Sequence, residues 1–278
     1  MLKKIKLDVI ILKYYNQAEV YMRIGFTTTS LRQIKDVEKI VDFARDAGVD
    51  CIEWGGDIHV TDVLIAQKAK KLCDDAGISE LIYGSYYRAG DNDREEWKRV
   101  CDIANALGAS SVRVWLGRKD SEETDKETYE AIIEDLKSMC SIASECGITV
   151  CPECHGNTFN NNTDAFLKIK KDVSCDNFKT YFQSLYKRKE YDLDRIERTL
   201  PFIESVHVSF FERIREQFPN FDGEYIDNLL DKLVECGFDG NILVEFTWFS
   251  YRYGVPSILK RDIEKLKTKL KCKQRSEH

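Results

Sequence analysis

The sequence contains no apolar stretch long enough to cross a membrane. A spanning helix takes about 18 or more consecutive apolar, uncharged residues, and no such run occurs in the 278 residues. Near the start, Asp8 and Lys13 bracket only the short apolar patch 9–12. A secretory signal core needs about 7–15 apolar residues. These absences predict a cytoplasmic protein with no membrane partner.

Basic residues are also in the minority. The 42 Lys and Arg are outnumbered by 48 Asp and Glu, which gives a formal net charge of −6. An acidic chain lacks the basic surface typical of nucleic-acid binders, so we expect no nucleic-acid partner. The chain also has no glycine-rich phosphate-binding loop and no low-complexity segment.

Cysteine, by contrast, is frequent. The ten cysteines are scattered over predicted helices and strands of a long chain, which favours reduced, buried thiols over a disulfide framework. Cys151 and Cys154 form a C-x-x-C pair, but the chain has no second pair and Glu153 lies inside the motif. A zinc ribbon is therefore not expected.

A repeated joint between helix and strand organises the chain. Five times a helix-like stretch is followed by glycine and then by an apolar residue that opens a strand. Glycine suits this position because it adopts the left-handed conformation that ends many helices. The spacing is about one βα unit, and the gap between 147 and 237 has room for two more joints, which predicts eight units. The joints are Ala47-Gly48-Val49, Ala76-Gly77-Ile78, Leu107-Gly108-Ala109, Cys146-Gly147-Ile148 and Cys236-Gly237-Phe238.

Eight βα units in a chain of this length predict a single (β/α)8 TIM barrel of the α/β class. The first predicted strand follows Met22 directly, so residues 1–21 are interpreted as an N-terminal extension and residues 22–278 as the barrel. The predicted strands are 23–27, 51–54, 81–85, 111–115, 149–153, 179–183, 205–208 and 242–245, with a loop at 86–93. The predicted helices are 34–47, 60–76, 94–107, 126–146, 163–173, 192–200, 224–236 and 257–270.

Strands five to eight each end in a polar side chain at the face where TIM barrels place their catalytic groups. Strand alternation lets these four side chains converge inside the barrel mouth. Two carboxylates, one imidazole and one amide oxygen suit a divalent cation such as Mn²⁺, Mg²⁺ or Co²⁺, with Zn²⁺ also compatible, and leave positions open for substrate oxygens. The predicted metal ligands are Glu153, Gln183, His207 and Glu245.

Arg113 and Trp115 share one face of the fourth strand. An arginine beside an indole suits a carboxylate or phosphate with a sugar ring stacked nearby. The alternative is a structural Arg113 that pairs with Glu153 or Glu53. The sequence leaves both interpretations open.

Four further residues lie on strand ends or loops of the same face and are predicted to contact substrate. His155 is placed beside the metal ligands or against a substrate hydroxyl. The other three are Glu53, His59 and Arg88.

Several segments together resemble the xylose-isomerase-like TIM-barrel superfamily of sugar phosphate isomerases and epimerases. The resemblance covers residues 22–270 and points to a largely uncharacterised bacterial subgroup. The segments that carry it are Ile52 to His59, Tyr83 to Arg88, Val112 to Trp115, Glu153-Cys154-His155 and Val206-His207-Val208.

The resemblance implies an isomerase or epimerase that moves a proton next to a carbonyl through an enediolate. In such epimerases Glu, Asp, His and Glu hold the metal, and they correspond here to Glu153, Gln183, His207 and Glu245. Gln183 departs from the pattern, because an amide lacks the negative charge of Asp. The two glutamates would also act as bases on opposite faces of the substrate.

Alternatives remain on the same barrel. Apurinic-site endonucleases share the fold but use a histidine-rich trinuclear zinc cluster, and this acidic chain has only four histidines, one of them the terminal His278. A dehydratase of a keto-inositol or keto-sugar would use the same enolate, and a non-catalytic sugar-binding barrel would need no metal. The expected partner in each remaining case is a small-molecule carbohydrate. Its identity, its phosphorylation and a homo-oligomeric state stay open.

Overall fold

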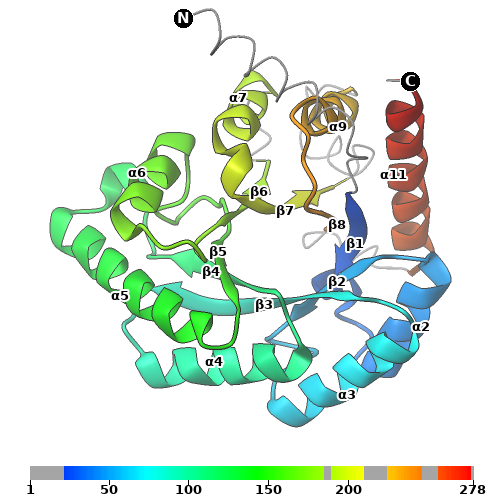
Figure 1. Cartoon of the computed structure of the whole chain (residues 1–278), viewed down its shortest axis with the longest axis horizontal. Coiled ribbons are helices and arrows are strands. Elements are labelled where there is room, and N and C mark those ends of the chain that lie inside the picture. Colours follow the sequence, from blue (N-terminus) through cyan, green and yellow to red (C-terminus); the bar gives the residue numbers. More distant parts are fainter. Residues whose placement is uncertain (1–21, 185–188, 210–223, 246–255, 277–278) are drawn as a thin grey trace, which may run out of the picture.

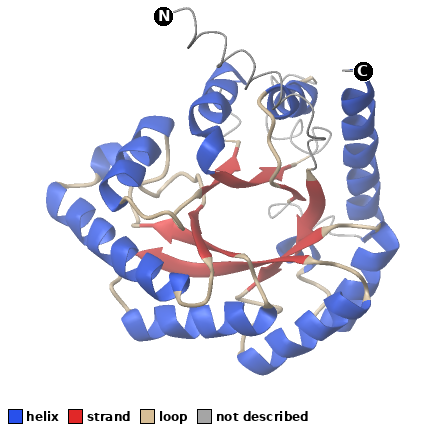
Figure 2. Ribbon diagram, in the orientation of Figure 1, coloured by secondary structure: helices blue, strands red, loops and turns tan. Residues whose placement is uncertain are grey.

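The computed structural model describes residues 22–184, 189–209, 224–245 and 256–276. Eight strands form the inside of the molecule and helices surround them (Figures 1 and 2). The strands are β1 (Arg23–Thr27), β2 (Cys51–Gly55), β3 (Glu80–Ala89), β4 (Ser111–Leu116), β5 (Thr149–Pro152), β6 (Thr180–Gln183), β7 (Ile203–Val208) and β8 (Asn241–Val244). The helices are α2 (Val37–Ala47), α3 (Val63–Asp75), α4 (Arg94–Leu107), α5 (Lys126–Ser144), α6 (Thr163–Val173), α7 (Lys189–Thr199), α9 (Tyr225–Glu235) and α11 (Pro256–Ser276), with short 3-10 turns η1 (Thr28–Leu31), η2 (Ser121–Glu123) and η3 (Leu200–Phe202).

The strands are parallel and follow the order β5-β4-β3-β2-β1-β8-β7-β6. Between β5 and β6 the pairing is reduced to two isolated bridges, Val150 with Phe178 and Glu153 with Tyr181. We call this β5/β6 junction the seam. The predicted single (β/α)8 barrel is therefore confirmed, nearly closed, with one sparsely paired junction.

The helices begin and end at the residues that local chemistry favours. Asp36, Asp62, Asp93 and Asp125 each accept a hydrogen bond from a backbone N–H in the first turn of α2, α3, α4 and α5. At the other ends, the five predicted glycine joints all have positive φ, between 60° and 75°. This left-handed conformation satisfies the last carbonyls of each helix and starts the return to the barrel.

Strand β3 is longer than predicted. The sequence interpretation ended it at Ser85 and placed a loop at 86–93, but the strand continues to Ala89. It does so because Arg88 and Ala89 pair with Trp115 and Leu116 of β4, after a register shift that begins at Gly84. A bulge of this kind turns side chains toward a new direction at the barrel rim.

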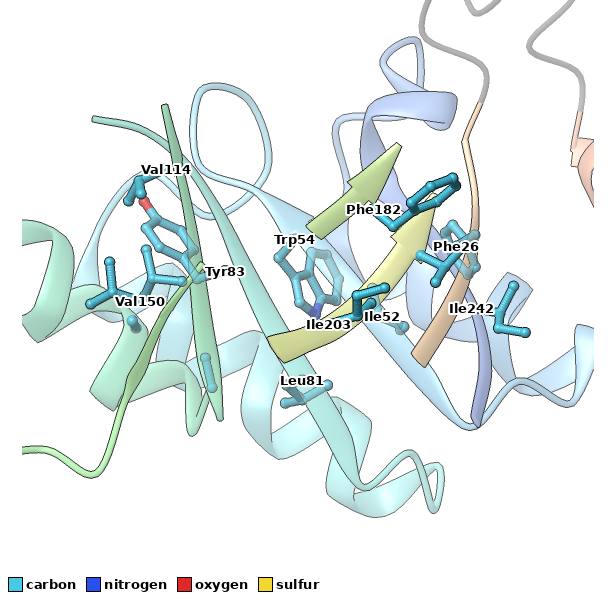
Figure 3. Packing of buried hydrophobic residues seen from close by; sticks show 14 of the residues in the cluster. Phe26, Ile52, Trp54, Leu81, Tyr83, Val114, Val150, Phe182, Ile203 and Ile242 are labelled. Atoms are coloured by element: carbon cyan, nitrogen blue, oxygen red, sulfur yellow. The ribbon is translucent and has the colours of Figure 1, made fainter. Parts of the chain in front are cut away.

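Most buried apolar side chains pack between the strands and the surrounding helices (Figure 3). A second, small cluster consists of Cys51, Ile82, Cys151, Tyr181 and Leu243. Four of its members lie two residues before a polar strand-end residue, and side chains two apart share a face of a strand. This cluster is therefore the apolar floor beneath the polar barrel mouth.

Other predictions concern the thiols and the chain outside the described residues. The nine cysteines whose state the structure gives are free, in agreement with the expected reduced thiols. Among the described helices, none is long and apolar enough to span a membrane. The predicted extension 1–21 and the segments 210–223 and 246–255 lie outside the described residues.

Candidate active site

The four predicted metal ligands come together around one imidazole nitrogen. His207 Nδ1 lies 3.6 Å from Glu153 Oε1, 3.4 Å from Glu245 Oε2 and 3.3 Å from Gln183 Oε1. Glu153, His207 and Glu245 form a buried group whose ligand atoms lie within 4.8 Å of one another, close enough to hold a metal ion. The convergence rests on strand alternation at the carboxyl ends of β5 to β8.

These distances fit a divalent cation. Ligand atoms at about 2.0–2.6 Å from a metal are about 3–4 Å apart when they are neighbours in a tetrahedral or octahedral shell. The separations of 3.3–3.6 Å between His207 Nδ1 and the three oxygens fall in this range. Oxygen ligands with a single imidazole suit a hard or borderline ion.

Glu53 reaches the same imidazole from the other side of the barrel. Its Oε2 lies 3.0 Å from His207 Nε2, and its Oε1 accepts a hydrogen bond from Arg113 Nε at 3.0 Å. Strands β2 and β7 are not neighbours in the sheet, so the contact crosses the barrel interior. The sequence predicted Glu53 as a substrate contact and gave no sign of this pair, because the two residues are 154 positions apart.

Arg113 pairs with both glutamates, which is the alternative that the sequence left open. Its Nη1 donates to Glu153 Oε2 at 2.5 Å, and Trp115 Nε1 donates to the same oxygen at 3.0 Å. The guanidinium is buried, with 5% of its side chain exposed. The second carboxylate oxygen, Glu153 Oε1, is the one that faces His207.

The buried charges shift one another's protonation. Burial would raise the pKa of Glu53 and Glu153, but the charge of Arg113, with that of His207, outweighs it and lowers both pKa values. For Arg113 and His207, burial opposes the charge, yet the surrounding carboxylates raise the pKa of each side chain well above its ordinary value. Glu53 and Glu153 are therefore ionised beside the cationic side chains of Arg113 and His207.

A wall of aromatic rings stands beside Glu153. His155 stacks on Trp115 with ring centroids 5.2 Å apart and an interplanar angle of 13°, and the Arg88 guanidinium carbon lies 4.1 Å from the Trp115 ring centroid. The structure therefore brings together three predicted substrate residues. It adds Tyr86, which sequence reasoning missed, with its ring centroid 6.1 Å from that of Trp115 and 43% of the residue exposed.

His59, also predicted to contact substrate, is buried and bonded within the protein. Its Nε2 lies 2.9 Å from the carbonyl oxygen of Ile34, so this nitrogen is the donor, and Nδ1 lies 2.9 Å from Thr28 Oγ1. Thr28 Oγ1 already accepts from the Gly55 N–H, which lets its own hydrogen point to His59. Burial lowers the pKa of His59 to about 4, so the ring is neutral near pH 7.

A separate hollow of about 890 Å³ lies where the N-termini of α5, α6 and α7 meet, outside the barrel mouth. It is lined by side chains such as Tyr129, Phe159 and Tyr191 and shares no residue with the metal-ligand group. The candidate metal ligands therefore lie in the barrel mouth and not in this hollow.

Eight parallel strands with a metal-capable cluster at their carboxyl ends define a TIM barrel with a candidate metal centre in its mouth. A family model described as a xylose isomerase-like TIM barrel matches residues 41–269, more than half of the chain. The chain belongs to this family.

Individual relatives are distant. A 3-dehydroshikimate dehydratase of Bacillus anthracis is 20% identical over 198 residues, which is 67% of this chain and 71% of the relative. Among solved structures, a probable 3-DHS dehydratase of the same organism has a TM-score of 0.73 at 17% identity and covers 88% of this chain and 99% of that one. A D-allulose 3-epimerase from Methylomonas sp. has a TM-score of 0.71 at 15% identity, with 90% and 97% covered. At such identities the structural likeness shows the fold alone.

Proposed function

We propose that this protein is a metal-dependent isomerase or epimerase that acts on a ketose, its phosphate or a related carbohydrate. The observation that carries the proposal is that Glu153 and Glu245, from the ends of two different strands, each bring a carboxylate oxygen close to His207 Nδ1, at 3.6 and 3.4 Å. Inversion at a carbon requires one base for each face of a planar intermediate, and two carboxylates at one metal position could supply both. Epimerases among the structural neighbours support this choice.

The metal would be held by Glu153, Gln183, His207 and Glu245 and would supply positive charge to the oxygens of an enediolate. Because three of the four ligands would bind through oxygen, Mn²⁺ and Mg²⁺ are the ions we favour. Each glutamate would take or return one proton at the substrate carbon. Because Arg113 and Trp115 occupy Glu153 Oε2, the working oxygen on that side is Oε1.

The aromatic wall would orient the substrate. A sugar ring presents C–H groups on its face, and these pack well on indole and phenol rings. The exposed ring of Tyr86 offers such a surface beside Trp115, whose own ring already contacts His155 and Arg88, and Arg88 adds a cation for a polar or anionic substituent. We expect the reacting carbon to lie between this wall and Glu245.

A dehydratase is the second candidate, and specific observations favour it. A 3-dehydroshikimate dehydratase is a curated relative, and a probable 3-DHS dehydratase is among the solved neighbours. Dehydration shares the first step, removal of a proton next to a carbonyl, and then expels a hydroxide from the neighbouring carbon. It needs the enolate centre but no base on the second face.

Both candidates can be tested by incubating the Mn²⁺-loaded protein with ketoses, ketose phosphates, keto-inositols and dehydroshikimate in deuterated water. Deuterium gained at carbon by NMR reports enolisation, a new epimer reports epimerisation, and loss of water by mass spectrometry reports dehydration. The control is Glu80→Gln, because Glu80 begins β3 at the opposite end of the barrel and bonds Ser110.

The two-base assignment predicts that Glu153→Gln and Glu245→Gln each abolish net epimerisation but keep exchange from one of the two epimers. Metal content must be measured in both variants, since both residues are also proposed ligands. Exchange of both epimers at the wild-type rate in a metal-loaded variant would remove that glutamate as a base. A wild-type protein that binds sugars, binds no metal and incorporates no deuterium into them would be a non-catalytic barrel.

A further inference from the structure

We propose that Glu53 is the positioning residue of the metal centre: it fixes His207 with Nδ1 presented as a ligand and couples that imidazole to Arg113, and through Arg113 to Glu153. The inference rests on the proposed metal-dependent function. It assigns Glu53 a role different from contact with substrate.

The two oxygens of the Glu53 carboxylate face Arg113 and His207. Oε1 faces Arg113 Nε, which carries a hydrogen and can only donate. Oε2 faces His207 Nε2 at 3.0 Å. A carboxylate accepts at both oxygens, so both neighbours are satisfied when His207 carries its hydrogen on Nε2.

That hydrogen position determines what the opposite nitrogen can do. With the hydrogen held on Nε2, a metal ion that displaces the proton of Nδ1 would meet the lone pair of that nitrogen, which faces the oxygens of Glu153, Gln183 and Glu245. A metal-bound imidazole is usually held in this way, with its other nitrogen donating to a carboxylate. Tyr181 packs edge-on against the His207 ring, with centroids 5.1 Å apart and planes at 89°, and limits its rotation.

Arg113 connects Glu53 to a second proposed metal ligand, Glu153. Its Nε bonds Glu53 and its Nη1 bonds Glu153, so displacement of Glu53 would also move the cation that holds Glu153. The backbone leaves room for this pair at Gly84, where an added Cβ would lie 2.7 Å from Glu53 Oε1 and 3.2 Å from Arg113 Nη2. The packing of β3 is thus built around the Glu53–Arg113 contact.

The key variant is Glu53→Gln, which keeps the shape but replaces one acceptor with an NH₂ donor. Whichever way the amide turns, one of Arg113 and His207 faces a donor, and the His207 hydrogen moves to Nδ1 or the contact is lost. We expect the Mn²⁺ dissociation constant, measured by titration calorimetry, to rise by about 10- to 100-fold, the usual effect of such outer partners. The visible spectrum of the Co²⁺-loaded variant should change with the loss or distortion of the nitrogen ligand.

The matched control is Glu204→Gln, which removes a carboxylate from the same strand as His207. Glu204 pairs with Lys179 and does not contact the imidazole. We expect it to leave the Mn²⁺ dissociation constant and the Co²⁺ spectrum unchanged. Gly84→Ala is a second variant that crowds the Glu53–Arg113 pair without removing a charge, and it should weaken metal binding in the same direction.

A double-mutant cycle separates positioning from a general loss of structure. In a His207→Ala background, Glu53→Gln should weaken Mn²⁺ binding much less than in the wild type, because the nitrogen it positions is gone. An equal loss in both backgrounds, or wild-type affinity in Glu53→Gln and Gly84→Ala, would overturn the inference. Failure of the wild type to bind a divalent ion would instead refute the proposed function.

Discussion

Gln183 presents an amide where Asp is usual in the epimerases that this chain resembles. Its Oε1 lies 3.3 Å from His207 Nδ1, beside the two glutamates. The amide keeps an oxygen for a metal ion but contributes no negative charge. The candidate centre therefore carries one negative charge fewer than it would with Asp at this position.

We predict that Gln183→Asp tightens Mn²⁺ binding by at least about tenfold, roughly 1.4 kcal/mol, because it adds a charge next to the ion. Gln183→Leu should weaken binding, since it removes the oxygen. Isothermal titration of the three proteins at one pH gives the comparison. Equal affinities would exclude Gln183 from the centre.

His59 gives a pH dependence whose sign follows from its burial. Its pKa falls from an ordinary 6.5 to about 4 in the folded protein, so the folded state binds fewer protons than the unfolded state between these values. Its contribution to stability is present above pH 6.5 and is lost as the pH falls toward 4. The loss amounts to about 3 kcal/mol at most.

Urea unfolding of wild type and His59→Gln at pH 7 and pH 4.5 tests this prediction. The variant should be less stable at pH 7, because it loses contacts with Thr28 and Ile34. Its stability should also fall less steeply on acidification. The readout is the difference between the two proteins in the free energy of unfolding lost from pH 7 to pH 4.5, since carboxylates shared by both proteins contribute equally. An equal loss of stability in both proteins would contradict the contribution assigned to His59.

The helix-to-strand joint at Gly147 depends on backbone conformation rather than on packing. Gly147 has φ of 68° and an added Cβ there would meet nothing within 4 Å. Gly156 is equally open but does not have positive φ. The two positions differ in backbone strain alone.

We predict that Gly147→Ala destabilises the protein by about 1 kcal/mol, the usual cost of placing a side chain in the left-handed region. Gly156→Ala should change the free energy of unfolding by less than about 0.5 kcal/mol. Denaturant unfolding of both variants gives the comparison. A Gly147→Ala protein as stable as wild type would mean that the loop relaxes out of the left-handed conformation.

The sequence predicted the features that neighbouring residues determine and missed those that depend on contacts between distant residues. Glycine joints are local, so the unit count followed from five positions, and the strand-end residues around His207 followed from alternation within each strand. The end of β3 depends on register with β4, and the role of Glu53 depends on a contact across the barrel. Such contacts join residues far apart in the chain and leave no periodic signal.

At the scale of the whole molecule, the barrel is continuous except at the seam between β5 and β6. Three backbone hydrogen bonds cross it, from the N–H groups of Val150, Lys179 and Cys154. The other neighbouring strands are joined by parallel pairing, with register shifts only between β3 and β4 and between β6 and β7. Glu153 and Gln183 stand at the ends of the two seam strands and face the same imidazole.

A cation bound by both Glu153 and Gln183 would join β5 to β6, the two neighbouring strands whose pairing is reduced to isolated bridges. Addition of Mn²⁺ should therefore slow amide hydrogen exchange at Val150, Cys154 and Lys179 more than in the regular pairing of β2 with β3. An even slowing across all strands would contradict this. The metal would then serve two purposes from one position. Besides its chemistry, it would link β5 to β6 and complete the barrel, and its removal would weaken the barrel at the seam.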